Sequence, residues 1–246
     1  MRQTDVQAQS DVRLRPGDCA KREHPDNARR GVYHVRMTYR LAMFDFDGTL
    51  ADSFPFVLTV FNTIADQHGF RRIDVARADE LRHLHVRQMM DHVGMPAWKL
   101  PLASKTFMTM MRDSAHAIPL FDGIADALRH LHDRGVVLTV VSSNAEHNVR
   151  AVLGPELAAL IQRFECGMSV FGKASRIRAV LKACGAAPAD ALYIGDQTTD
   201  AEAAQKAGVA FGAVHWGIAT IEALRAQACA TEFVTPTDLR RIAAAS

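Results

Sequence analysis

Residues 41–50, LAMFDFDGTL, decide the fold of this chain. The apolar run at residues 41–44 predicts a buried strand, and a Gly-Thr turn follows the second acid. Because side chains alternate along a strand, Asp45 and Asp47 face the same way at its C-terminal end. In open α/β sheets that edge is where ligands bind. Two acids held there can bind a hard cation, attack a phosphoryl group or transfer a proton.

The composition is that of an ordinary globular protein. The chain has 246 residues, of which 48% are hydrophobic and 23% charged, which predicts one large domain or a core with an insert. A net charge of +2 argues against nucleic acid and membrane surfaces as partners. No apolar run reaches the roughly 18 residues of a transmembrane helix, and the N-terminus lacks the apolar segment of a secretory signal.

The four cysteines are far apart in the sequence and form no Cys-x-x-Cys pair. This spacing argues against a zinc site and against a disulfide framework. Reduced thiols fit a cytoplasmic location, which we therefore expect.

Beyond the first strand, the pattern alternates between helices and strands. Strands are predicted at residues 39–46, 136–141, 164–168, 191–194, 209–214 and 232–234. Helices are predicted at residues 54–68, 75–85, 86–93, 98–115, 124–134, 148–153, 156–163, 173–184, 199–207 and 218–227. This order indicates the α/β class, with a doubly wound, parallel, Rossmann-like sheet. The helices between the first two strands form an insert, and right-handed crossovers place the strand ends on one side.

Residues 1–36 differ from the rest of the chain. They carry eight Lys and Arg residues against five acids and few large apolar residues. We expect a disordered extension. One alternative is a basic arm that binds an anionic partner, and another is that Met37 is the native start.

Further polar residues lie where later strands end. Ser142 follows the second strand, Lys173 opens a helix, and Asp196 and Asp200 follow a later strand. These ends converge in a parallel sheet, so the acids would repel one another without a cation. Oxygen ligands with no nearby His or Cys favour Mg²⁺ over zinc. Each acid by itself has a simpler interpretation, since Asp-Gly is common in turns and Asp caps helices.

Four segments, in this order, resemble the four motifs of the haloacid dehalogenase superfamily. They are DFDGTL at residues 45–50, VVSSN at 140–144, GK at 172–173 and YIGDQTTD at 193–200. The resemblance covers about residues 38–240 and is closest to the phosphoglycolate-phosphatase-like branch, which has a small helical cap. It implies a Rossmann-like core of residues 37–52 and 118–246, with residues 53–117 as an α-helical cap domain.

The resemblance implies a Mg²⁺-dependent phosphomonoester hydrolase that acts on a small phosphorylated metabolite, with phosphoglycolate as the family-level expectation. Asp45 resembles the nucleophile that forms an aspartyl-phosphate, and Asp47 resembles the general acid and base. Asp196 resembles the Mg²⁺ ligand that acts together with Asp45 and the backbone carbonyl of Asp47. Asp200 resembles a residue that supports the metal shell.

The second and third motifs imply the phosphate site. Ser142 resembles the hydroxyl that binds the phosphoryl oxygens, although Ser143 and Asn144 are also within reach of a phosphate there. Lys173 resembles the cation that steadies nucleophile and phosphate. Its position at a helix start also predicts an anion beside it, because a cation there opposes the helix dipole.

The cap residues that would read the substrate are less clear. Arg87 and Lys99 are candidate contacts for a carboxylate or a second phosphate. The alternative is a solvated helix face, which we favour for either residue taken singly.

The motifs exclude two related functions and leave two alternatives open. Asp47 argues against a dehalogenase and a phosphonate-cleaving enzyme, because those members of the family lack an acid there. A sugar-phosphate mutase uses the same two aspartates and stays open. A protein that binds a phosphorylated metabolite without catalysis is a second alternative.

Overall fold

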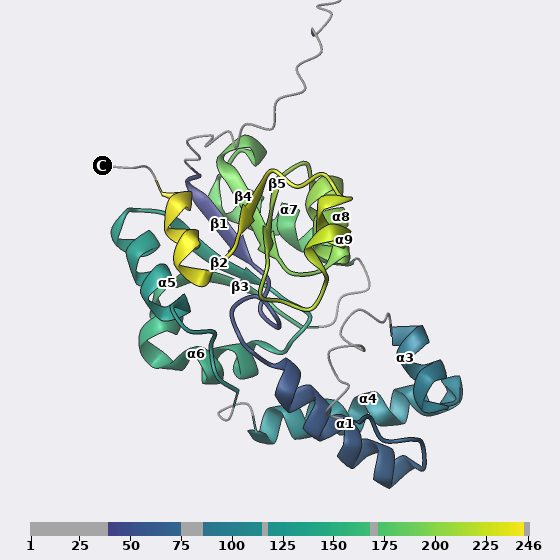
Figure 1. Cartoon of the computed structure of the whole chain (residues 1–246). Coiled ribbons are helices and arrows are strands. Elements are labelled where there is room, and N and C mark those ends of the chain that lie inside the picture. The colour runs from purple at the N-terminus through teal and green to yellow at the C-terminus, as the bar shows by residue number, and fades with distance from the viewer. Residues whose placement is uncertain (1–38, 75–85, 115–117, 168–171, 244–246) are drawn as a thin grey trace, which may run out of the picture. The chain divides into compact units, whose positions relative to one another are not determined.

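A six-stranded sheet, parallel throughout, organises the fold in the computed structural model (Figure 1). The structure describes residues 39–74, 86–114, 118–167 and 172–243. The strand order is β3-β2-β1-β4-β5-β6. The strands are β1 (Leu41–Phe44), β2 (Val137–Val141), β3 (Ile161–Glu165), β4 (Ala191–Gly195), β5 (Ala210–Val214) and β6 (Thr231–Phe233). This doubly wound parallel sheet confirms the predicted fold class.

The polar residues that follow β1, β2 and β4 meet because β1 lies between the other two strands. Phe44, its last residue, is level with Val140 of β2 and Ile194 of β4. The chain order reverses between these two neighbours of β1, which makes this the switch point of the sheet. A ligand crevice opens at such a point, outside the carboxyl ends of the strands. The residues directly after β1, β2 and β4 therefore border one space.

Both faces of the sheet are covered by helices (Figure 1). Ala42 and Phe44 pack into one hydrophobic cluster with α5 (Ile124–Asp133), α6 (Glu146–Leu160) and η5 (Pro236–Ile242). Leu41 and Met43 pack into the opposite cluster, and the helices there are α7 (Gly172–Cys184), α8 (Thr198–Ala207) and α9 (Ile221–Arg225). A strand buried on both faces reads as a continuous apolar run, which is why residues 41–44 carry no polar alternation.

The insert has a hydrophobic cluster of its own. Its described elements are α1 (Phe54–His68), α3 (Val86–Val93), η2 (Ala97–Lys99) and α4 (Leu100–Ser114). Leu58 and Ile64 of α1 pack with Val93 and Ala103 in a third cluster. The helix α1 begins and ends at the predicted residues. The helix predicted at 75–85 and the extension 1–36, with Met37, lie outside the described residues.

The prediction for residues 161–163 was wrong. They were assigned to a helix, with a strand at 164–168, whereas β3 covers Ile161–Glu165. The preceding helix α6 runs to Leu160 and is interrupted at Gly154, whose φ of 69° and ψ of 168° are not helical. Parallel pairing with β2 places Ile161 opposite Leu138 and decides the conformation. Local helix propensity is a weak prior against such pairing.

The C-terminal elements also depart from the predicted pattern. The helix predicted at 218–227 is shorter, since α9 covers only Ile221–Arg225. Ile218 and Ala219 instead donate backbone hydrogen bonds to Asp196, at 2.8 and 3.1 Å. Two 3₁₀ helices, η4 (Pro188–Asp190) and η5, were not predicted. Within the described ranges, every helix is too short or too polar to cross a membrane.

Candidate active site

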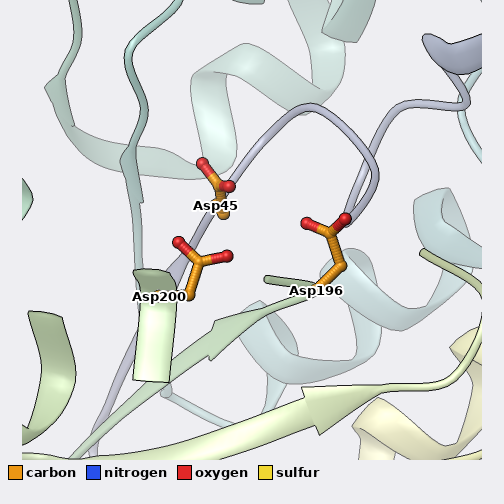
Figure 2. Close-up of side chains that lie close together, drawn as sticks. All are labelled: Asp45, Asp196 and Asp200. Atoms are coloured by element: carbon orange, nitrogen blue, oxygen red, sulfur yellow. The ribbon is translucent and has the colours of Figure 1, made fainter. Parts of the chain in front are cut away.

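Three buried carboxylates meet at the switch point of the sheet. Asp45 directly follows β1, Asp196 directly follows β4, and Asp200 lies in the first turn of α8. We call these three residues the acidic cluster. Each offers one carboxylate oxygen, and those oxygens all lie within 4.8 Å of one another. Figure 2 shows the three side chains turned toward the same space. The structure thus brings together three of the acids that the sequence singled out.

Glycines allow the backbone to close around the acidic cluster. A Cβ atom on Gly48 would lie 2.3 Å from an oxygen of Asp196, and one on Gly217 would lie 2.1 Å from the Cβ of Asp196. Both distances are shorter than real atoms permit, so any side chain at these positions would displace the carboxylate. Gly48 also has a φ of 80°, a left-handed conformation that favours glycine.

Asp196 is held by two hydrogen bonds. The Thr49 hydroxyl donates to its Oδ1 at 3.0 Å, and the backbone N–H of Ile218 donates to its Oδ2 at 2.8 Å. Burial nevertheless raises the pKa of Asp196 to about 7, and the nearby charge of Asp200 adds to that effect. The carboxylate is therefore fixed in place, yet its negative charge is not compensated by the protein.

Asp200 connects the acidic cluster to a lysine. The Lys173 ammonium donates to Asp200 Oδ1 at 2.5 Å, and the backbone N–H of Gln197 donates to Oδ2 at 3.0 Å. Both oxygens of Asp200 are thus engaged, one with a cation and one in capping α8. The Tyr193 hydroxyl also lies 3.4 Å from Oδ1. Asp200 therefore holds Lys173 in place.

Lys173 bridges two of the three acids. It is the second residue of α7, and its Nζ lies 3.0 Å from Asp45 Oδ2. Burial is the largest single effect and lowers the pKa of this ammonium, but the charges of Asp45 and Asp200, Tyr193 and the hydrogen bond to Asp200 together raise the pKa well above its ordinary value. Lys173 is therefore charged, and the anion expected beside a cation at a helix start is present.

The charges of this site do not balance. Among the residues that the structure describes, three acids of the acidic cluster face one ion-paired ammonium, that of Lys173. Burial, with the nearby charge of Asp200, raises the pKa of Asp45 well above its ordinary value. An oxygen-only set of ligands with surplus negative charge suits a hard divalent cation such as Mg²⁺. The residues present therefore fit the predicted metal.

Asp47 stands apart from the acidic cluster. Its Oδ2 accepts a hydrogen bond of 3.0 Å from Asn144 Nδ2. Its Oδ1 is buried and has no hydrogen-bond partner among the described residues. Burial raises the pKa of Asp47, against the nearby polar side chains of Ser53 and Asn144, which lower it. This environment favours the protonated carboxylic acid.

The three polar residues after β2 have different surroundings. Ser142 is buried, and its Oγ accepts a hydrogen bond of 3.1 Å from the backbone N–H of Asn144. Ser143 is exposed. Asn144 is buried and directs its amide at Asp47, so its side chain has an alternative role to phosphate binding.

Sequence reasoning missed several residues that support the site. The Trp216 indole donates to the Thr49 carbonyl at 2.9 Å and packs edge-to-face on Phe121. Arg176 donates to the Ser142 carbonyl at 2.6 Å. Trp216 follows β5, so the rule that strand ends converge would have identified it. Arg176 lies inside a helix, where no local pattern marks it.

The two cap candidates have different settings. Lys99 donates a hydrogen bond to the His68 carbonyl at the end of α1, and its Nζ lies 5.3 Å from the Trp98 ring centre. Its ammonium thus joins η2 to the end of α1 within the insert. Arg87 is exposed on α3.

Comparisons with known proteins show the family and the fold of this chain. The family model described as haloacid dehalogenase-like hydrolase matches residues 42–214. The phosphoglycolate phosphatase of Synechococcus elongatus is 32% identical over 198 residues, which cover 80% of this chain and 93% of that protein. Phosphoglycolate phosphatase 1 of Pseudomonas aeruginosa is 26% identical over 190 residues, covering 72% and 70%. A haloacid dehalogenase-like hydrolase from Streptococcus pneumoniae has the same fold, with a TM-score of 0.72, 19% identity and coverage of 83% and 97%.

Proposed function

Since this chain belongs to the haloacid dehalogenase-like hydrolase family, we propose that it is a Mg²⁺-dependent phosphatase whose substrate is a small phosphorylated metabolite, phosphoglycolate first among them. The observation that carries this proposal is the uncompensated charge of the acidic cluster beside Lys173. The surplus negative charge favours binding of a divalent cation, and the bound cation in turn allows an anionic substrate to bind.

The chemistry proceeds in two steps on Asp45. In the first, a carboxylate oxygen of Asp45 forms a bond to phosphorus while the bond from phosphorus to the ester oxygen breaks. The carboxylic acid of Asp47 gives its proton to the departing oxygen, which leaves as an alcohol. The product on the protein is an aspartyl-phosphate.

In the second step, water releases the phosphate. The Asp47 carboxylate takes a proton from water as the water oxygen bonds to phosphorus, and the bond between phosphorus and Asp45 breaks. Asp47 is then protonated again and Asp45 is a carboxylate, so the cycle closes. The raised pKa of Asp47, caused by burial, supports its role as the acid in the first step.

Positive charge makes the attack possible, because nucleophile and phosphate are both anions. Lys173, 3.0 Å from Asp45, supplies one such charge. Asp45, Asp196 and the backbone carbonyl of Asp47 would hold Mg²⁺, with Asp200 in support. When bound, Mg²⁺ neutralises the negative charge that carboxylates and phosphate bring together. We assign the hydroxyl of Ser142 to the phosphoryl oxygens.

The helical insert, residues 53–117, is proposed to act as a cap. It begins directly after the loop that carries Asp47, and it packs through a hydrophobic cluster of its own. A unit attached in this way can close over the substrate and exclude bulk water. Arg87 and Lys99 stay candidates for substrate recognition within it.

A panel of phosphorylated metabolites assayed with Mg²⁺ tests this function. The wild-type protein is compared with Asp45→Asn, which keeps the shape of the side chain and removes the nucleophile. We expect hydrolysis by the wild type, with phosphoglycolate among the best substrates, and none by the variant. Metal-dependent turnover by Asp45→Asn at the wild-type rate would overturn the scheme.

A further inference from the structure

Asn148 is a buried polar residue that the proposed function leaves without a role. It is the third residue of α6, and the residue is 1% exposed. The other buried side chains of α6 are Val149, Leu153, Leu157 and Ala158, all of them apolar. Burying an amide among apolar groups is unfavourable unless hydrogen bonds compensate. The contacts of Asn148 should therefore show its role.

Asn148 begins a chain of two amides that ends at Asp47. Its Nδ2 donates to Asn144 Oδ1 at 3.0 Å, and Asn144 Nδ2 donates in turn to Asp47 Oδ2 at 3.0 Å. Asn144 Oδ1 also accepts the backbone N–H of Ala145 at 2.8 Å. If the Asn144 amide turned over, its NH₂ group would face two donors. Asn148 and Ala145 together thus fix which end of Asn144 faces Asp47.

The orphaned oxygens of the structure lie at the two ends of this chain. Among the described residues, the only buried side-chain nitrogen or oxygen atoms without a hydrogen-bond partner are Asp47 Oδ1 and Asn148 Oδ1. Leaving such an atom unpaired is unfavourable, because the group loses its hydrogen bonds to water and gains none in the protein. Turning the Asn148 amide would place its oxygen against Asn144 Oδ1 and break the chain. The Asn148 amide therefore keeps the orientation in which its Nδ2 donates to Asn144, although its own Oδ1 stays unpaired.

We propose that Asn148 is a positioning residue for Asp47. It locks the Asn144 amide, which binds Asp47 Oδ2 and leaves Oδ1 as the oxygen that exchanges the proton. This inference rests on the proposed function, in which Asp47 is the acid and base. Asn148 acts through Asn144 and does not touch the substrate, so its loss slows the chemical steps without weakening binding.

The test replaces Asn148 with leucine, which has a similar volume and no donor. We expect kcat to fall about 10- to 100-fold, less than the roughly 10²–10⁴-fold that general acid–base catalysis contributes as a whole, because Asp47 itself is retained. KM should change less than about twofold. Thr139→Val is the matched control, since Thr139 is a fully buried polar residue of β2 whose hydroxyl donates to the Ala42 carbonyl at 3.3 Å, away from Asp47. It should lower Tm and leave kcat unchanged.

A double-mutant cycle with Asn144→Ala separates positioning from general destabilisation. If Asn148 acts through Asn144, adding Asn148→Leu to Asn144→Ala causes no further loss of kcat. Losses that multiply in the double variant, or a kcat of Asn148→Leu equal to that of the wild type, would overturn the proposal. Should Asn148→Leu fail to fold, Asn148→Ser serves the same cycle, because its hydroxyl is too short to reach Asn144.

The Asp45→Asn variant, assayed in parallel, keeps the two proposals apart. Turnover by Asp45→Asn would overturn the proposed function. An inactive Asp45→Asn together with an unaffected Asn148→Leu would overturn only the positioning role.

Discussion

Two groups of charged side chains in this protein are built in opposite ways. The acidic cluster is buried, and in the part of the chain that the structure describes it pairs with one cation, Lys173. At the edge strand β6, by contrast, a single acid, Glu232, accepts two hydrogen bonds of 2.8 Å from Arg225 and lies 2.9 Å from His215. The first group has surplus negative charge, and the second has a partner for its one carboxylate.

The pKa shifts of the two groups follow from this difference. Burial raises the pKa of Asp196 to about 7, whereas the hydrogen bonds from Arg225 lower the pKa of Glu232. Folding therefore disfavours the charged form at the acidic cluster and favours it at β6. Strongly perturbed acids at a strand-end crevice are typical of functional sites, and matched surface pairs are typical of structural ones. This difference agrees with the proposed function, in which the acidic cluster serves the chemistry at a cost in stability.

Removing one acid from the acidic cluster should have the largest effect. We expect Asp45→Asn to lower kcat roughly 10³-fold or more, as losses of a nucleophile do elsewhere. The same change removes one of the repelling charges, so Tm without Mg²⁺ should rise. Steady-state hydrolysis of an aryl phosphate and thermal unfolding measure the two effects. A variant that is both inactive and less stable than wild type would contradict the charge argument.

Adding Mg²⁺ should stabilise the acidic cluster and not the β6 group. At about 100 times its Kd, a ligand that binds only the folded state adds about 2.7 kcal/mol to the free energy of unfolding. Denaturant titrations with and without Mg²⁺ check this, with Asp196→Asn expected to lose most of the gain. Glu232→Gln serves as the control and should keep it. An equal response of both variants would show that Mg²⁺ binds elsewhere.

Acidification should change the contributions of the two groups to the free energy of unfolding in opposite directions. Asp196 has a pKa of about 7 in the folded state against an ordinary value of 3.8, so between these values the folded protein binds more protons than the unfolded chain. The free energy of unfolding without Mg²⁺ therefore increases as pH falls from about 8 to about 5. Unfolding in denaturant at a series of pH values measures it, and saturating Mg²⁺ should abolish the increase.

The smallest expected effect belongs to Glu232. Its lowered pKa gives stability that is present above its ordinary value of 4.5 and is lost as pH falls through the folded-state value. Because the ion pair is partly exposed, Glu232→Gln should cost only about 0.2–1 kcal/mol at neutral pH. Turnover should stay at the wild-type level. A large fall in kcat would mean that the β6 group is not merely structural.

Much of the fold was predictable because its signals are local. The apolar run before Asp45 and the helix-stop residue Gly69 mark β1 and α1 without knowledge of their partners. Residues 161–163 could not be assigned in that way, because pairing with β2 makes them a strand. The short α9 has a similar cause, because the backbone N–H of Ile218 donates to the Asp196 carboxylate and does not join the helix. The roles of the predicted site residues stay predictions until the variants are assayed.

The sequence by itself determined the α/β class, the family and the identity of the acids at the strand ends, because strand periodicity and short motifs are properties of neighbouring residues. Only the tertiary structure decided how those acids are paired. It directs Lys173 to Asp45 and Asp200, and it leaves the acidic cluster with surplus negative charge. It also connects Asn148 to Asp47 through Asn144. These contacts join segments from different strands and helices, so their geometry depends on how the elements pack and on which groups are removed from water.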